Sequence, residues 1–216
     1  MKRNFLILCL HGVLILYGFQ CRAQLYEANW NSLDRRPVPG WFTEAKFGIF
    51  IHWGVYSVPA WAPASEDIGI YAKYAEWYWQ RINGGKDPNP QKTDVNQLFI
   101  DYHNKIWGEN FKYQDFAPLW KAEQFNPSLW AEVFKKAGAK YVILTSKHHE
   151  GFALWPSAES WNWNSTDIGP HRDLVGELTN AVKANGLHMG LYYSLYEWFN
   201  PIYKTNPENY VTGHML

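Results

Sequence analysis

Residues 141–194 contain the pattern that decides the fold: YVILT at 141–145, DLVGELTNAVKANG at 173–186 and HMGLYYS at 188–194. The first and last segments are short apolar runs rich in β-branched and aromatic residues, which predicts buried strands. The middle segment predicts a helix that starts at Asp173, stops at Gly186 and has one apolar face. That face carries Leu174, Leu178, Ala181 and Val182. A strand, a capped amphipathic helix and a second strand are typical of a parallel βαβ unit.

The same pattern extends toward the amino terminus. FGIFIHW at residues 47–53 predicts another buried strand. A helix should begin after Asn126, a candidate N-cap followed by a proline, and stop at Gly138. We expect its apolar face to comprise Trp130, Val133, Phe134 and Ala137. The long connection that follows residue 53 should hold local helices and has room for one more strand, with a polar loop at 84–97. Three or four βα units are fewer than the eight of a closed barrel, which takes ~250 residues.

Composition narrows the function classes. The 216 residues are 47% hydrophobic and 19% charged, a balance that allows a packed core and argues against disorder. Lys and Arg number 20, as do Asp and Glu, so no basic excess favours nucleic acid as a partner.

Residues 1–23 differ from the rest and predict a secretory signal peptide. Lys2 and Arg3 precede an apolar stretch at 5–18, and a plausible cleavage site lies before Gln24. The stretch is shorter than the ~20 residues that a membrane-spanning helix needs, so we expect no span in the mature chain. A lipid anchor on Cys21 is disfavoured because small residues do not precede it. Cleavage would remove both cysteines and leave a net charge of −3 on residues 24–216, whose stability must then come from packing.

Polar side chains gather at the ends of the predicted strands. His52 closes the first strand, His148, His149 and Glu150 follow the second, and Tyr192 lies near the end of the third. In parallel α/β folds the carboxyl ends of strands form the active site, so these groups predict one common pocket. For His52 alone, a core histidine with a satisfied hydrogen bond is an equally good interpretation. We expect neither a metal nor a cofactor, because the two consecutive histidines point in different directions and no His-Glu-x-x-His helix is present.

The aromatic residues suggest the kind of ligand. The sequence has 13 tryptophans, and many follow predicted strand ends. They include Trp53, Trp61, Trp77, Trp79, Trp155, Trp161, Trp163 and Trp198. An indole offers an apolar face and a polar N–H, which suits a ligand with C–H faces and hydroxyl edges. Any single tryptophan is better explained as core, but the set beside histidines and a carboxylate favours a sugar.

Several motifs, in order along the chain, resemble the α-L-fucosidase family, glycoside hydrolase family twenty-nine. They are FGIFIHWG at 47–54, AEWY at 75–78, AGAKY at 137–141, KHHEGF at 147–152, SWNWNS at 160–165, RDLVG at 172–176 and GLYYS at 190–194. The resemblance covers about residues 26–216. It implies that residues 24–216 are the amino-terminal portion of a (β/α)₈-like, TIM-type barrel, an α/β fold left incomplete in this chain.

The resemblance also implies an activity, retaining hydrolysis of terminal α-L-fucose from a glycan, glycoprotein or glycolipid. It implies that fucose is bound by His52, Glu76, Trp77, His148, His149 and Tyr192. Tyr192 is preferred to Tyr193 because it is the first tyrosine of the family's pair. The resemblance allows a homo-oligomer of the full enzyme.

One part of the family pattern is missing. A retaining glycosidase needs a nucleophilic carboxylate and an acid/base carboxyl group, and the resemblance places both beyond Leu216. Glu150 and Glu197 are conceivable replacements that nothing in the sequence singles out. Two interpretations stay open: an amino-terminal portion of a fucosidase, or a short form that binds fucose without catalysis or is an inactive truncated product.

The predicted leader implies the secretory route. The destination would be the lysosome or extracellular space in a eukaryote, and the periplasm or extracellular space in a bacterium. Asn164 begins an Asn-Ser-Thr triplet and is a glycosylation candidate in a eukaryotic host.

Overall fold

The computed structural model describes residues 26–83 and 94–199. The chain divides into two units, residues 1–44 and 45–216. The first unit contains α2 (Trp30–Leu33), and α3 (Gly40–Ala45) spans its end. The predicted signal peptide, and most of the predicted polar loop at 84–97, lie outside the described residues. None of the helices in the described part is both long and apolar enough to cross a membrane.

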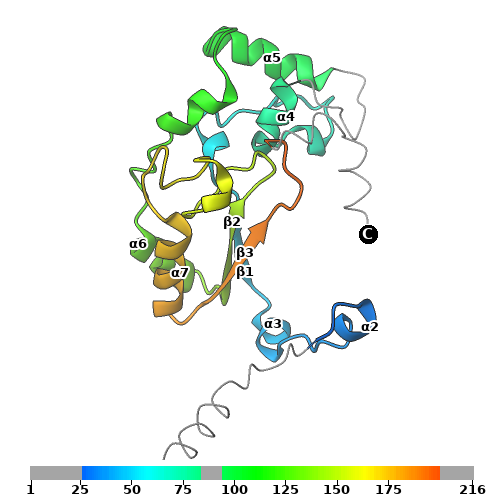
Figure 1. The fold of residues 1–216 in the computed structure, drawn as a ribbon, viewed down its shortest axis with the longest axis vertical. Coiled ribbons are helices and arrows are strands. Elements are labelled where there is room, and N and C mark those ends of the chain that lie inside the picture. Colours follow the sequence, from blue (N-terminus) through cyan, green and yellow to red (C-terminus); the bar gives the residue numbers. More distant parts are fainter. Residues whose placement is uncertain (1–25, 84–93, 200–216) are drawn as a thin grey trace, which may run out of the picture. The chain divides into compact units, whose positions relative to one another are not determined.

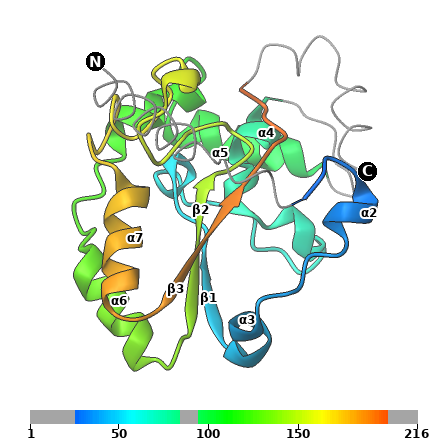
Figure 2. The same cartoon turned by 60° about the horizontal axis from the view of Figure 1, so that its bottom comes forward.

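A parallel sheet organises the second unit. Its described strands are β1 (Gly48–Ile51), β2 (Tyr141–Lys147) and β3 (His188–Tyr193), in the order β1-β2-β3. All three predicted strands are therefore confirmed, with β2 at the centre. Phe50, Ile143 and Gly190 lie at the same level of the sheet, so the three carboxyl ends reach one edge. The arrowheads in Figure 2 point toward the segment that holds α4 (Tyr78–Ile82) and α5 (Val95–Ile106).

Two helices cover one face of this sheet. α6 (Pro127–Lys136) precedes β2, and α7 (Leu174–Ala184) joins β2 to β3. They lie side by side in both views (Figures 1 and 2). Leu174, Leu178 and Val182 of α7 are fully buried, as the periodicity predicts. Burial of an aliphatic side chain stabilises the fold by about 1.5–3 kcal/mol, so this stripe anchors α7 to the sheet.

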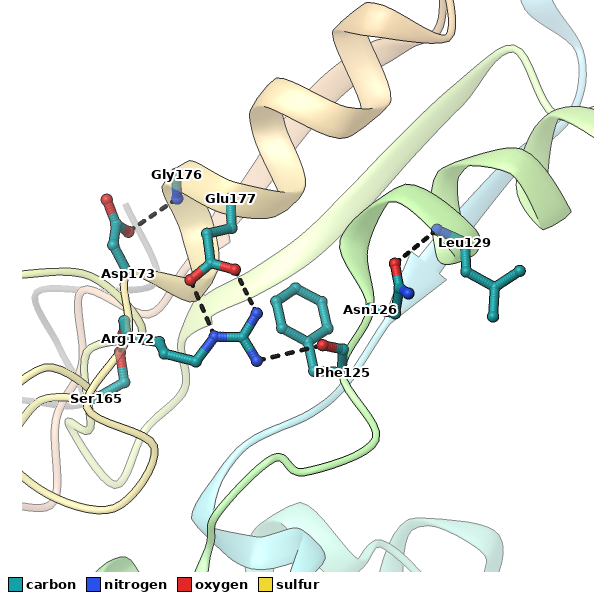
Figure 3. Close-up of polar contacts among 8 residues, drawn as sticks. All are labelled: Phe125, Asn126, Leu129, Ser165, Arg172, Asp173, Gly176 and Glu177. Atoms are coloured by element: carbon teal, nitrogen blue, oxygen red, sulfur yellow. Dashed lines mark hydrogen bonds and ion pairs between the residues drawn. The ribbon is translucent and has the colours of Figure 1, made fainter.

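Both predicted helix starts are confirmed. The side chain of Asn126 accepts a hydrogen bond from the backbone N–H of Leu129, and Asp173 accepts one from Gly176 (Figure 3). Each cap satisfies one of the backbone donors that a helix start leaves without an intrahelical partner.

Arg172 links the two helix starts. Its guanidinium forms an ion pair with Glu177 in the first turn of α7 and donates to the carbonyl oxygen of Phe125, just before α6 (Figure 3). The guanidinium also lies 4.9 Å from the centroid of the Phe125 ring. Hydrogen bonding to Glu177 is the main cause that raises the pKa of Arg172.

Two details of the predicted core were wrong. In α6 the fully buried residue is Ala131, whereas Val133 is 52% exposed and Ala137 is exposed. Trp130 and Phe134 do pack against the core. Val133 lies beside the row that these two residues form along the helix surface. Likewise only β2 is largely buried, while Phe50 of β1 and Leu191 of β3 are about half exposed. Both are edge strands of the described sheet.

The connection between β1 and β2 is helical in its described part. It contains α4, α5 and the 3₁₀ turns η1 (Val55–Ser57), η2 (Ile70–Ala72), η3 (Ala75–Trp77) and η4 (Tyr113–Leu119). The last 3₁₀ turn, η5 (Ala158–Ser160), lies between β2 and α7. No further strand occurs among the described residues of the β1–β2 connection. Its core is aromatic, with Tyr78, Phe99 and Phe116 fully or almost fully buried against one another.

Candidate active site

Two side chains at the carboxyl end of β2 form hydrogen bonds to the two neighbouring strands. The hydroxyl of Thr145 donates to the carbonyl oxygen of Ile51 at 2.8 Å, and that of Ser146 donates to the carbonyl oxygen of Tyr192 at 2.7 Å. Backbone positions next to His52 and at Tyr192 are therefore fixed by side chains of the central strand. Buried hydroxyl groups need such partners, because an unmet one costs about 1–3 kcal/mol.

An irregularity in the pairing of β2 with β3 sets the direction of the histidines. Thr145 pairs with Tyr192, but Lys147 pairs with Tyr193, so Ser146 is an extra residue on β2. An extra residue reverses the alternation of side chains beyond it. The ammonium of Lys147 accordingly lies 4.2 Å from the centroid of the Tyr193 ring, on one face of the sheet. His148 then falls on the opposite face, where its ring stacks with Tyr192.

The side chains predicted for the pocket do come together there. Ring centroids are 5.7 Å apart for His52 and His148, and 6.0 Å apart for each of these histidines and Tyr192. Phe50 supports the group from β1, at 4.9 Å from His52 and 5.8 Å from Tyr192. Four aromatic side chains from three strand ends thus form one cluster, which we call the histidine cluster.

His149 extends the cluster toward two tryptophans. Its ring centroid lies 4.7 Å from that of His148, 5.1 Å from Trp198 and 6.1 Å from Trp77. Its Nδ1 is 2.8 Å from the carbonyl oxygen of Tyr196. Since a carbonyl oxygen can only accept, Nδ1 carries a proton, and in the neutral ring the lone pair lies on Nε2. Trp198 also donates its backbone N–H to the carbonyl oxygen of His149, which ties the loops after β2 and β3 together.

Glu76 acts on this cluster through its charge. Partial burial lowers the pKa of His52 from its ordinary value of 6.5, and the nearby His148 lowers it further. The Glu76 carboxylate, and more weakly that of Glu150, oppose this effect and raise the pKa of His52. His52 is therefore biased toward the neutral imidazole, which can both donate and accept a hydrogen bond.

A buried polar layer lies beneath the histidines; the sequence placed Glu150 at this pocket but did not indicate Tyr56 or Tyr113. Glu150 is 1% exposed, and its carboxylate lies 3.5 Å from Nδ1 of His148. Tyr56, whose ring centroid is 5.8 Å from that of His148, and Tyr113 are also buried. Burial chiefly, and then the charge of Glu150, raise the pKa of both phenols well above the ordinary value. The only signal in the sequence was the position of Glu150 directly after the two histidines.

Most of the tryptophans that suggested a sugar site belong to the core. Trp53 packs against Trp120 and Trp130, and Trp163 against Phe152, whereas Trp161 is 64% exposed. Among the described residues, Trp77 and Trp198 are the tryptophans whose rings meet the histidines. The set of tryptophans that suggested a sugar was therefore too large, because only Trp77 and Trp198 of that set contact the histidines in the described part of the chain.

Asn164 is buried at 1% exposure. Its side-chain nitrogen donates to the hydroxyl of Ser160 and to the carboxylate of Asp167, at 2.9 and 2.6 Å. Its oxygen accepts the backbone N–H of Thr166. The side-chain amide of Asn164 thus serves as an internal support of the folded loop, and glycosylation at this residue stays a prediction.

In the described ranges 26–83 and 94–199, no group of three or more His, Cys, Asp or Glu side chains is placed to hold a metal ion. A separate hollow of about 430 Å³ lies by α4 and α5 and is bordered by Trp79, His103 and Phe111. None of its lining residues belongs to the histidine cluster.

The histidine cluster offers hydrogen-bond donors and acceptors on three ring systems, flanked by a carboxylate and two indoles. Imidazole and phenol groups can bind sugar hydroxyls in either direction, and a carboxylate can accept two of them. Indole faces can shelter an apolar part of the same ligand. This chemistry suits a monosaccharide.

Comparisons with known proteins show the family to which the chain belongs. The profile of the "Alpha-L-fucosidase" family matches residues 16–214, so the chain belongs to the α-L-fucosidase family. It is 49% identical to an α-L-fucosidase of Branchiostoma floridae over 201 residues, and 49% identical to the tissue α-L-fucosidase of Rattus norvegicus over 203 residues. Each match covers 92% of this chain but only 40% and 39% of those proteins.

A solved structure is similar in both sequence and fold. The α-fucosidase of Thermotoga maritima in complex with fucose superposes with a TM-score of 0.67 at 43% identity, over 87% of this chain and 44% of that one. The present chain therefore spans about two fifths of the length of the relatives it matches.

We predict that the pKa of His52, measured by NMR titration, lies below 6.5 and falls further in Glu76→Gln, which removes the largest opposing charge. Because the folded state disfavours protonation of His52, the contribution of His52 should lower the free energy of unfolding as the pH falls through 6.5. Glu177→Gln, which removes a carboxylate paired with Arg172, should leave the pKa unchanged. A higher His52 pKa in Glu76→Gln would contradict the assigned geometry.

Proposed function

We propose that this chain supplies the sugar-binding half of the active site of an α-L-fucosidase, which removes terminal α-L-fucose from glycans, glycoproteins or glycolipids with retention of configuration. The observation that supports this most directly is the convergence of His52, His148 and Tyr192, from three strands, on one face of the sheet. The structure of the Thermotoga maritima relative in complex with fucose supports the identity of the sugar.

In this proposal His52, His148, His149 and Tyr192 bind fucose hydroxyls, and Glu76 accepts from one or two more. Trp77 shelters the methyl group at carbon six. Trp77 packs edge-on against Trp198, at 5.4 Å between ring centroids, so its orientation is supported by the loop after β3. Fixed orientation matters because a hydrogen-bond group that is already aimed at the transition state need not reorganise during the reaction.

The catalytic carboxylates are proposed to lie beyond Leu216. A retaining enzyme requires two carboxyl groups ~5–5.5 Å apart around the bond that breaks. Glu150 lies buried under His148, and Glu197 forms an ion pair with Lys147 at 2.5 Å. Neither carboxylate is presented to a sugar above the histidine cluster, so neither is a good substitute for the nucleophile.

The parallel sheet and its two helices are proposed to be the amino-terminal part of a TIM-type barrel. The half-exposed side chains of Leu191 and Tyr193 on β3 fit this view, since another helix and strand would cover them in a barrel. The alternative, a short form that binds fucose without hydrolysing it, uses the same histidine cluster and differs only in catalysis.

A hydrolysis assay distinguishes the fucosidase from a short form that binds fucose without hydrolysing it. The protein at its native length should hydrolyse 4-nitrophenyl α-L-fucoside, and residues 24–216 alone should not. His149→Ala in the native-length protein should lower kcat/KM by an amount that corresponds to a loss of roughly 2–4 kcal/mol of transition-state stabilisation. Turnover by residues 24–216 alone would refute the placement of the nucleophile, and an unchanged kcat/KM in His149→Ala would refute the role of that residue.

Tyr192 and Tyr193 provide a matched pair for binding. Tyr192→Phe should weaken L-fucose binding roughly fivefold, because one hydrogen bond contributes about 1 kcal/mol. Tyr193→Phe should have little effect, since Tyr193 lies on the other face beside Lys147. Isothermal titration calorimetry measures both, and a larger effect of Tyr193→Phe would mean that the assignment of the two faces is wrong.

We further propose that residues 1–23 direct the protein into the secretory route, in keeping with tissue and plasma fucosidases among its relatives. The secreted protein should begin at Gln24, which amino-terminal sequencing would show. A mature protein that retains Lys2 and Arg3 would contradict this.

A further inference from the structure

Two buried polar atoms beneath the histidine cluster face each other without hydrogen-bond partners. Nδ1 of His148 and Oε2 of Glu150 each lack one among the described residues, and they are 3.5 Å apart. Their side chains are only 4% and 2% exposed, so water cannot freely compensate. A buried polar atom left without a partner destabilises the folded state.

The chemistry of the pair decides where the proton lies. An ionised carboxylate only accepts hydrogen bonds, and an imidazole nitrogen either donates or accepts. With Glu150 ionised, an unprotonated Nδ1 of His148 would place two lone pairs face to face in a buried site. If Nδ1 carries the proton, a small rotation closes 3.5 Å to an ordinary hydrogen bond, and both atoms are satisfied.

The surroundings keep Glu150 in place for this task. Its backbone carbonyl oxygen accepts the indole N–H of Trp163 at 2.9 Å, and Trp163 is itself packed against Phe152. On the other side, the carboxylate lies near Gly54: a Cβ there would make an ordinary contact of 3.6 Å with Oε1 of Glu150 and a tighter one of 3.1 Å with the ring of Tyr56. The backbone of Glu150 is thus held by Trp163, and its carboxylate lies near Gly54.

We propose that Glu150 is a positioning residue that holds His148 as the Nδ1–H tautomer and presents the lone pair of Nε2 to a sugar hydroxyl. Only the last step of this inference, the contact of Nε2 with a sugar hydroxyl, rests on the proposed function. A carboxylate that orients a histidine in this way often changes the activity of a site about 10–100-fold when it is lost, as for histidines that bind metals.

The direct test is the tautomer of His148 in the native-length protein labelled with [¹⁵N]histidine. Long-range ¹H–¹⁵N spectra distinguish Nδ1–H from Nε2–H, and His148→Gln identifies the signal by its loss. We expect Nδ1–H in the unmodified protein. Observation of Nε2–H there would overturn the inference, whatever the variants show.

Glu150→Met removes the acceptor and keeps an unbranched side chain of similar length. We expect the His148 signal to move toward Nε2–H and L-fucose binding to weaken about 10-fold or more. Glu197→Gln is the matched control, because it removes a carboxylate that pairs with Lys147 and should leave the tautomer of His148 unchanged. An unchanged tautomer in Glu150→Met would also overturn the inference.

The two proposals fail separately in these experiments. Nδ1–H on His148 without any fucose binding would refute the proposed function and leave the role of Glu150 toward His148 intact. Fucose binding with Nε2–H on His148 would refute the role of Glu150 and leave the proposed function standing.

Discussion

The extra residue at Ser146 is the constraint on which the geometry of the site depends. Up to Thr145 the central strand alternates in step with its neighbours, and beyond Ser146 the alternation is reversed. Lys147 consequently turns toward Tyr193 and Glu197, while His148 turns toward His52 and Tyr192. With regular pairing, the two would exchange faces and a cation would occupy the place of the imidazole.

The rest of the described fold supports this strand end. Parallel pairing brings β1 and β3 to the same level as β2, and the hydroxyls of Thr145 and Ser146 tie their ends together. On one face of the sheet, α6 and α7 are capped at Asn126 and Asp173 and joined through Arg172. At the carboxyl ends of the strands, the loops after β2 and β3 are joined by the ion pair of Lys147 with Glu197 and by the backbone hydrogen bond from Trp198 to His149.

Elements whose signal is local could be predicted from the sequence. The three strands and the two capped helices follow from apolar runs and N-cap residues, and the structure confirms them. The clustering of His52, His148 and Tyr192 follows from one rule, that parallel strands end at a common edge. What could not be predicted depends on contacts between distant residues. The exposure of Val133 depends on which elements cover α6, and the burial of Glu150 depends on Tyr56 and Tyr113 from the β1–β2 connection.

The tryptophans illustrate the same limit. Composition and position relative to strand ends could not separate Trp77, which meets His149, from Trp53, which packs against Trp120 and Trp130. Trp53 follows a strand and Trp77 precedes a helix. Only the packing of the β1–β2 connection decides which of the two indoles faces the histidines. Family resemblance did separate them, because it compares residues with positions whose surroundings are already fixed.

The most direct test of the account is a crystal structure of the native-length protein with L-fucose bound. The account predicts that the sugar lies against His52, His148, His149 and Tyr192, with its methyl group toward Trp77. Fucose bound only elsewhere, for example in the hollow beside Trp79 and His103, would contradict the central claim that the strand ends form the sugar site.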